Sequence, residues 1–288
     1  MSIDMLQEKI RKTKNPSMLE LALPVSELPP RFARNGEGYA AFCRELLEAM
    51  KGFLPAVRLS FASFVLLGHD GLYHLSETLK KAGELGYYVL LDAPEILSPA
   101  AAKLIADSLW CEGSLYPCDG LVISGYLGSD VIKPFLPYCK KEKKDLFVVA
   151  RTANKSAPEV QDLLAGSRLV HAAAADHVNR YGADTAGKCG YTNVGILGAA
   201  SSAESLKSLR TKYPKLFLLA DGYDYPNANA KNCANAFDQF GHGAVVCGGT
   251  GITCAWKTAE SHGEDYLDHA KAAAERMKKN LTRYVTVL

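Results

Sequence analysis

Short, almost continuously apolar segments alternate along the chain with longer segments of helical periodicity. Such apolar runs are typical of parallel strands that are buried on both faces of a sheet. We predict strands at Met18–Leu23, Ala56–Leu59, Tyr87–Asp92, Gly120–Ser124, Leu146–Ala150, Val194–Leu197, Leu216–Ala220 and Gly243–Cys247. The intervening pattern predicts helices over Gly36–Lys51, Gly71–Leu85, Ser201–Tyr213 and Asp265–Tyr284.

Strands that alternate with helices over 288 residues predict an α/β fold, a single-domain (β/α)8 TIM barrel. No linker rich in proline or serine divides the chain. We therefore expect one domain over residues 1–288, with an N-terminal basic extension over 1–16 and a C-terminal helix over 265–288. A doubly wound open sheet is the alternative fold. It is disfavoured because no G-x-G-x-x-G follows the first strand and no Walker A motif occurs.

Composition and charge argue against a nucleic-acid-binding protein, a membrane protein and a secreted protein held by disulfides. The chain has 33 Lys and Arg against 31 Asp and Glu, so no strong field attracts nucleic acid or an anionic membrane. Its apolar runs are far shorter than the roughly 20 residues that cross a bilayer. The eight cysteines contain no C-x-x-C pair, and no signal-peptide pattern begins the chain. We expect a reduced, cytoplasmic protein with no metal site and no cofactor.

Candidate chemistry belongs at the carboxyl ends of the strands, where the active sites of TIM barrels lie. The pair Asp92 and Arg58 is either a residual catalytic pair or a buried ion pair that joins two strands. We favour the ion pair, because burial of an unpaired charge is costly. The candidates for binding a substrate or phosphate are Ser124, Arg151, Asp221, Gly222, Gly248, Gly249, Thr250 and Gly251.

Several of these candidates have an alternative structural interpretation. The segment Cys247–Ile252, "CGGTGI", is either an anion cradle or a tight turn that needs glycine. Asp221, Asp224 and Tyr225 either form a metal or sugar site, since hard cations prefer oxygen ligands, or the two carboxylates are solvated in a loop, which we favour. Asp176 and His177, with His171 nearby, resemble a polar pair on a helical stretch, and we expect them to have a surface or helix-packing role.

Four segments of the chain resemble the orotidine 5′-phosphate decarboxylase family, in its longer bacterial-type branch. They are "CDGLVISGYLGSDVIKPFL", "LFVVARTANKSAPEVQDLL", "VGILGAASSAESL" and "AVVCGGTGI". The match from Arg151 to Leu163 is the most specific, and the resemblance covers nearly the whole chain. It implies a TIM barrel, a homodimer with sites near the subunit interface, and an ancestral role in pyrimidine nucleotide biosynthesis.

The sequence departs from the family at its charged positions. The family motif at the end of the third strand is D-x-K-x-x-D, and this chain has "LDAPEILSP" there. Asp92 matches the first Asp, Pro94 stands at the proton-donating Lys, and Leu97 stands at the second Asp. Three further positions differ: Arg58 stands at a Lys, Ala22 at a substrate-binding Asp, and Thr250 at the phosphate-binding Arg.

These departures predict a decarboxylase-like barrel with impaired or absent decarboxylation. Arginine does not release its proton near neutral pH, and proline carries no acid. One alternative is an active decarboxylase whose lysine comes from Lys140–Lys144 or from a partner chain. A second is a non-catalytic subunit that binds a nucleotide, another phosphorylated small molecule or a protein partner. A third is new chemistry by Arg58, Asp92, Glu95 and Asp221, with or without a metal, so the sequence leaves open whether the chain is an enzyme.

Overall fold

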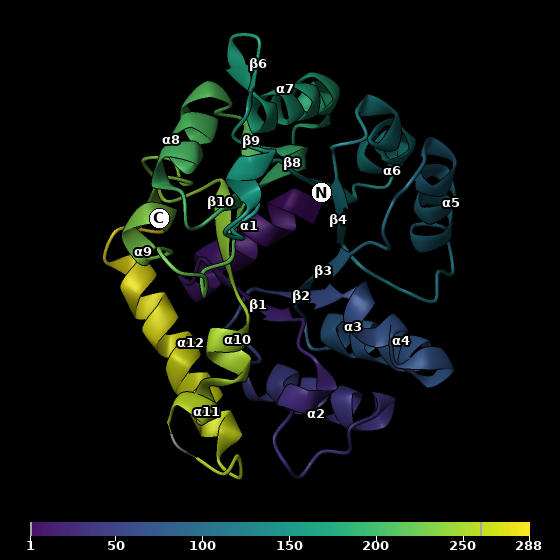
Figure 1. Cartoon of the computed structure of the whole chain (residues 1–288), viewed down its shortest axis with the longest axis vertical. Coiled ribbons are helices and arrows are strands. Elements are labelled where there is room, and N and C mark those ends of the chain that lie inside the picture. Colours follow the sequence, from purple (N-terminus) through teal and green to yellow (C-terminus); the bar gives the residue numbers. More distant parts are fainter. Residues whose placement is uncertain (1, 260) are drawn as a thin grey trace.

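The apolar segments form a closed barrel of eight parallel strands in a computed structural model that describes residues 2–259 and 261–288 (Figure 1). The order of neighbouring strands is β1-β10-β9-β8-β5-β4-β3-β2, and β1 pairs with β2 to close the ring. The barrel strands are β1 (Ser17–Leu21), β2 (Ala56–Ser60), β3 (Tyr88–Asp92), β4 (Gly120–Ser124), β5 (Asp145–Val149), β8 (Thr192–Ala199), β9 (Leu216–Asp221) and β10 (Ala244–Gly248). The predicted TIM barrel is therefore confirmed, and the open sheet is excluded.

Helices surround the barrel and cover the outer faces of the strands (Figure 1). They are α1 (Ser2–Thr13), α2 (Gly36–Ala49), α3 (Phe61–Val65), α4 (Gly68–Glu84), α5 (Pro99–Leu109), α6 (Leu136–Lys141), α7 (Val170–Gly182), α8 (Ala203–Lys212), α9 (Ala230–Ala234), α10 (Thr250–Thr253), α11 (Ala255–Thr258) and α12 (Tyr266–Thr282). Short 3-10 helices occupy Val25–Glu27, Ser129–Val131, Lys133–Phe135, Ala157–Glu159 and Ala183–Thr185. Across the described residues, no helix combines the length and apolar composition that crossing a membrane requires.

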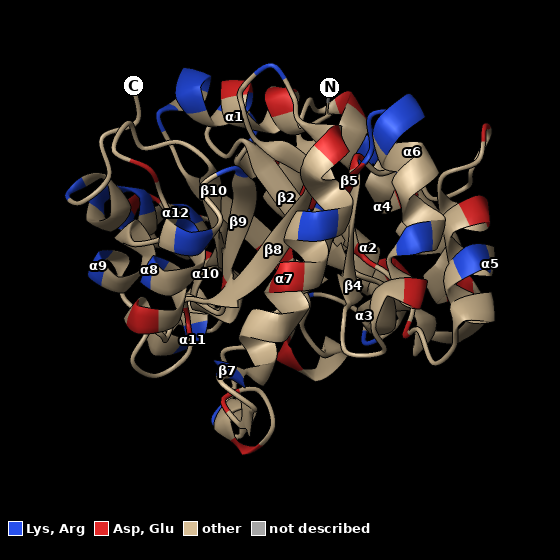
Figure 2. Cartoon of the chain, turned by 90° about the horizontal axis from the view of Figure 1, so that it is seen from above, with Lys and Arg blue, Asp and Glu red and all other residues tan. Residues whose placement is uncertain are grey.

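The two ends of the barrel differ in what covers them (Figure 2). The N-terminal helix α1 lies across the amino ends of the strands, with Ile3, Leu6 and Ile10 fully buried. The antiparallel hairpin of β6 (Leu164–Ala165) and β7 (Arg168–Leu169) projects from the opposite end. The carboxyl ends of the strands therefore open on the side that carries the hairpin, and α1 seals the other side.

Strand register decides which side chains meet inside the barrel. Glu20 pairs with Arg58 across β1 and β2, and Ser60 pairs with Asp92 across β2 and β3. Side chains two residues apart on a strand share a face. Arg58, Glu20 and Asp92 consequently face the same interior space near the carboxyl ends.

Candidate functional site

Arg58 is the centre of a charged cluster at the mouth of the barrel. Its Nε donates to Asp92 Oδ1 at 2.7 Å, and its second donor nitrogen, Nη1, donates to Asp221 Oδ1 at 2.6 Å. The same Nη1 lies 3.3 Å from Glu20 Oε1 and 4.0 Å from Cys247 Sγ. Only 7% of Arg58 is exposed. The predicted contact between Arg58 and Asp92 is therefore present, and it forms part of a larger cluster that also holds Glu20 and Asp221.

The protonation of this cluster is governed by burial and by the shared guanidinium. Burial raises the pKa of Glu20 to about 7, against the attraction of Arg58, and the neighbouring carboxylates Asp221, Asp92 and Asp224 raise it further. Burial also raises the pKa of Asp92, which Arg58 opposes. Burial lowers the pKa of Arg58, but its carboxylate neighbours outweigh this and bring it well above its ordinary value. The guanidinium thus remains charged at any physiological pH and gives up no proton.

The glycine-rich segment after β10 is occupied by a side chain of the same molecule. Asp224 Oδ2 accepts a hydrogen bond of 2.5 Å from the backbone N–H of Gly249. A Cβ atom placed on Gly251 would lie 2.2 Å from Asp224 Oδ1, so glycine leaves the room that the carboxylate fills. Gly222 has a φ of +77° directly after β9, which turns the chain back toward this loop. The predicted anion cradle therefore already holds a carboxylate.

A cavity of about 310 Å³ opens at this end of the barrel. Its wall includes Glu20, Asp224, Tyr225, Cys247 and Thr250. None of the described residues that line it is basic, because Arg58 lies deeper and is engaged by its carboxylate partners. The cavity is accordingly electronegative, which is the opposite of what a phosphate dianion requires.

One oxygen or sulfur atom from each of Glu20, Asp221 and Cys247 lies within 4.8 Å of the others. This spacing alone would suit a metal ion, and a carboxylate pair with a thiolate is a reasonable donor set for zinc. However, burial raises the pKa of the Cys247 thiol well above its ordinary value, and the nearby Glu20 raises it further. Arg58 Nη1 also lies against all three groups. The residues present therefore fit an arginine ion cluster and do not fit a metal centre.

The other predicted residues of the mouth lie apart from this cluster. Arg151 forms a two-pronged ion pair with Asp162, at 2.9 and 2.8 Å, and His171 Nδ1 lies 3.1 Å from the same carboxylate. This network anchors the segment between β5 and α7, from which the hairpin projects. Ser124 ends β4 with an exposed side chain, whose Oγ accepts from the N–H of Tyr126. The binding roles of Ser124 and Arg151 stay predictions.

Two further polar residues considered from the sequence, Asp176 and Glu95, lie outside the Arg58 cluster. Asp176 contacts Tyr213, Lys212 and Arg168, and so links α7 to α8 and to the hairpin. Glu95 is exposed in the loop after β3, and the structure, over the residues it describes, places it in no contact with the Arg58 cluster.

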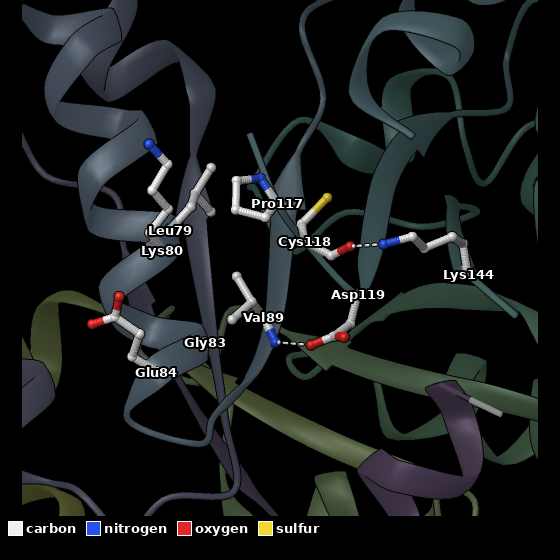
Figure 3. A pocket seen from close by; sticks show the side chains of 9 residues that line it. All are labelled: Leu79, Lys80, Gly83, Glu84, Val89, Pro117, Cys118, Asp119 and Lys144. Atoms are coloured by element: carbon white, nitrogen blue, oxygen red, sulfur yellow. Dashed lines mark hydrogen bonds between the residues drawn. The ribbon is translucent and has the colours of Figure 1, made fainter. Parts of the chain in front are cut away.

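The lysine run Lys140–Lys144 lies at the wrong end of the barrel to replace a catalytic lysine. Lys144 precedes β5, and its Nζ donates to the carbonyl of Cys118 at 2.6 Å (Figure 3). There it borders a cavity of about 380 Å³, where Asp119 accepts from the N–H of Val89 at 2.8 Å. Lys140 pairs with Asp184 at 3.4 Å. The suggestion that this run supplies a relocated lysine within the same chain is therefore wrong.

Glu20 was missed by the sequence analysis, although it is a central member of the cluster. It lies inside the apolar run "MLELAL", which predicts a strand. One signal could have identified it: Glu20 is a carboxylate within a strand predicted to be buried on both faces. A buried charge needs a partner of opposite charge, so its position alone indicated an ion pair. Its pairing with Arg58 followed only from the strand register.

Comparisons with known proteins agree with the resemblance found in the sequence. A curated protein of Clostridium novyi, named orotidine 5′-phosphate decarboxylase, is 27% identical over 286 residues, which cover 98% of both chains. A protein of the same name from Rhodopirellula baltica is 29% identical over 251 residues, covering 84% of this chain and 83% of the relative. The chain is a relative of the orotidine 5′-phosphate decarboxylases. No protein-family model matches it.

Solved structures similar to the chain share its architecture. The structure of the Leishmania donovani OMP decarboxylase superposes with a TM-score of 0.76 at 23% identity, covering 98% of both chains. At this identity the likeness supports the barrel fold. The assignment to the neighbourhood of orotidine 5′-phosphate decarboxylases rests on the curated relatives, of which the Clostridium novyi protein matches nearly end to end.

Proposed function

We propose that this chain keeps the barrel of the orotidine 5′-phosphate decarboxylases but does not catalyse their decarboxylation. The observation that carries the proposal is the engagement of Arg58 by Asp92, Asp221 and Glu20. By resemblance, Arg58 stands where the family has a lysine, and a guanidinium held by carboxylates is neither mobile nor acidic enough to deliver a proton. Pro94, at the position of the proton-donating lysine, has no acid to replace it.

The surroundings of the glycine-rich loop also argue against an orotidine phosphate ligand. Asp224 occupies the Gly249 N–H, and Thr250 stands at the position of the family's phosphate-binding arginine. Among the described residues, Arg58 is the cation that pairs with Glu20, Asp92 and Asp221, and Asp224 adds a fourth carboxylate beside them. A phosphate dianion that entered this space would meet net negative charge in a partly buried site.

The direct test is decarboxylation of orotidine 5′-monophosphate by the purified full-length chain. We expect its rate to lie at least about 10⁴-fold below that of a bacterial relative measured in parallel, because proton donation and electrostatic preorganisation are both absent. The loss of ultraviolet absorbance of the substrate and the release of carbon dioxide measure the rate. Turnover within tenfold of the relative would refute the proposal.

An active decarboxylase that obtains its lysine elsewhere is the second candidate, and the near end-to-end match with a decarboxylase favours it. Lys155 is exposed in the loop after β5, on the open side of the barrel, and is the first lysine to test. If the wild-type chain turns over the substrate, Lys155→Met should abolish the activity under this candidate, whereas Lys140→Met, at the sealed end, should leave it unchanged.

We also infer that the chain forms a homodimer through its open end. Exposed leucines follow the carboxyl ends of the neighbouring strands β2, β3 and β4: Leu66 is 84% exposed, Leu97 75% and Leu127 52%. Burial of such side chains contributes about 1.5–3 kcal/mol each, and a second copy of the same face would cover them.

The dimer is tested by replacing leucines of similar exposure at the open end and on the flank of the barrel, where the carbonyl of Leu115 accepts from Ser76 in the middle of α4. Leu97→Glu is expected to shift the molecular mass in analytical ultracentrifugation from dimer to monomer. Leu115→Glu, at a side chain that is 65% exposed in the loop before β4, serves as the matched control and should leave the dimer intact. A wild-type chain that sediments as a monomer at micromolar concentration would contradict the inference.

A further inference from the structure

A third cavity lies on the flank of the barrel, beside the loop after β9 that also borders the mouth. It has a volume of about 470 Å³ and lies between the segment that joins β9 to α9 and the C-terminal end of α12. Figure 1 shows α9 and α12 next to each other. The polar residues that line it are Tyr223, Asn229, Lys231, Asn280, Arg283 and Tyr284. We call it the flank pocket.

The flank pocket has uncompensated positive charge. Lys231 and Arg283 both line it, and both are exposed. Within the part of the chain that the structure describes, neither has an ion-pair partner, and none of the lining residues is acidic. In Figure 2, the blue segments of basic residues occur on both α9 and α12. The flank pocket is thus positively charged, whereas the mouth is negatively charged because its carboxylates outnumber Arg58.

The other polar groups of the flank pocket suit an anion with several acceptor atoms. Asn229 caps α9, with its Oδ1 accepting from the N–H of Asn232 at 2.9 Å, so its amide nitrogen remains as a donor. Asn280 forms a hydrogen bond with the Tyr223 phenol, whose pKa is raised by burial. The backbone N–H of Tyr223 donates to the carbonyl of Cys247 and ties the pocket wall to β10. These contacts hold Tyr223, Asn229 and Asn280 in place, so ordering on binding is limited to the exposed side chains of Lys231 and Arg283.

We propose that the flank pocket binds a small phosphorylated anion with at least two negative charges, through Lys231 and Arg283. The planar guanidinium of an arginine matches two oxygens of one phosphate, and a lysine supplies a point charge to a second. Tyr284 is 55% exposed at the rim and offers a flat face to any ring that the anion carries. This site is independent of whether the mouth retains any catalysis.

Isothermal titration of the full-length chain with inorganic pyrophosphate, ATP and uridine tests the proposal. We expect pyrophosphate and ATP to bind and uridine, which has no phosphate, not to bind. The double variant Lys231→Gln/Arg283→Gln should weaken the binding of both phosphate compounds by about 100-fold, or about tenfold for each positive charge that it removes. Higher salt should weaken binding to the wild type as well.

The matched control is Lys271→Gln/Lys279→Gln, which removes two positive charges from exposed positions of α12 that do not line the flank pocket. It should change the affinities by less than threefold, and circular dichroism should show that both double variants stay folded. The proposal is overturned if neither phosphate compound binds at millimolar concentration, if the control weakens binding as much as the pocket variant, or if uridine binds as tightly as ATP.

Discussion

Replacing Arg58 with methionine is expected to lower the free energy of unfolding by about 3–5 kcal/mol at pH 7, the cost of leaving buried charges without their partner. The side chain is 7% exposed and is the cation that Asp92, Asp221 and Glu20 share. Methionine fills much of the same volume, so loss of charge rather than loss of packing dominates the change. Urea unfolding followed by circular dichroism measures the effect.

Two comparisons make the Arg58 prediction specific. Arg276→Met removes a cation from an exposed position of α12 and should change the unfolding free energy by less than about 0.5 kcal/mol. The loss in Arg58→Met should also shrink toward pH 4, because protonated carboxyls no longer need the guanidinium. A loss below about 1 kcal/mol at pH 7 would mean that the carboxylates find solvent without Arg58, and the ion-cluster interpretation would fail.

Replacing Glu20 with glutamine is expected to stabilise the protein at pH 8 and to have little effect at pH 4. The pKa of Glu20 is about 7 in the folded protein, against an ordinary 4.5. Because the folded value is the higher one, the favourable contribution of Glu20 is fully present below about pH 4.5 and is lost as the pH rises through about 7. Glutamine cannot ionise and avoids this loss, which is on the order of 2–3 kcal/mol.

The pH dependence of the difference between Glu20→Gln and the wild type is the measurement that decides this prediction. Unfolding free energies at half-unit steps from pH 4 to pH 8 should diverge in favour of the variant above about pH 5. Glu95→Gln, a change of the same type at an exposed glutamate of the open end, should give a flat difference. If Glu20→Gln is less stable than the wild type at pH 8, the ionised Glu20 carboxylate stabilises the folded protein through its pair with Arg58, and the prediction is wrong.

The architecture was predictable because each strand has a local signal in its own hydropathy. All eight apolar segments are barrel strands, and the segment Gly120–Ser124 has the predicted bounds. The largest error in length is at β8, which begins at Thr192 instead of Val194 and ends at Ala199 instead of Leu197. Thr192 and Asn193 are polar and the later part contains glycine, so hydropathy did not reveal that the backbone stays extended and buried there.

The sequence contains a signal for the helical face of α1 beside its basic residues. Ile3, Leu6 and Ile10 have the spacing of one helix face, and all are fully buried against the amino end of the barrel. The many basic residues of the same segment lie on the other side of the helix and suggested only a basic extension. The hairpin of β6 and β7 had no comparable signal, since its strands have only two residues each.

The sequence by itself determined the barrel, its resemblance to the decarboxylases and the identity of the side chains at the strand ends, because periodicity and residue type are local properties. Only the tertiary structure decided how those side chains combine. Glu20 and Asp221 are 201 positions apart, yet barrel closure brings both to Arg58. The return of Asp224 to Gly249 depends likewise on the turn at Gly222. Charges from separate strands become one titrating unit only when the ring closes and excludes the water that would otherwise screen them.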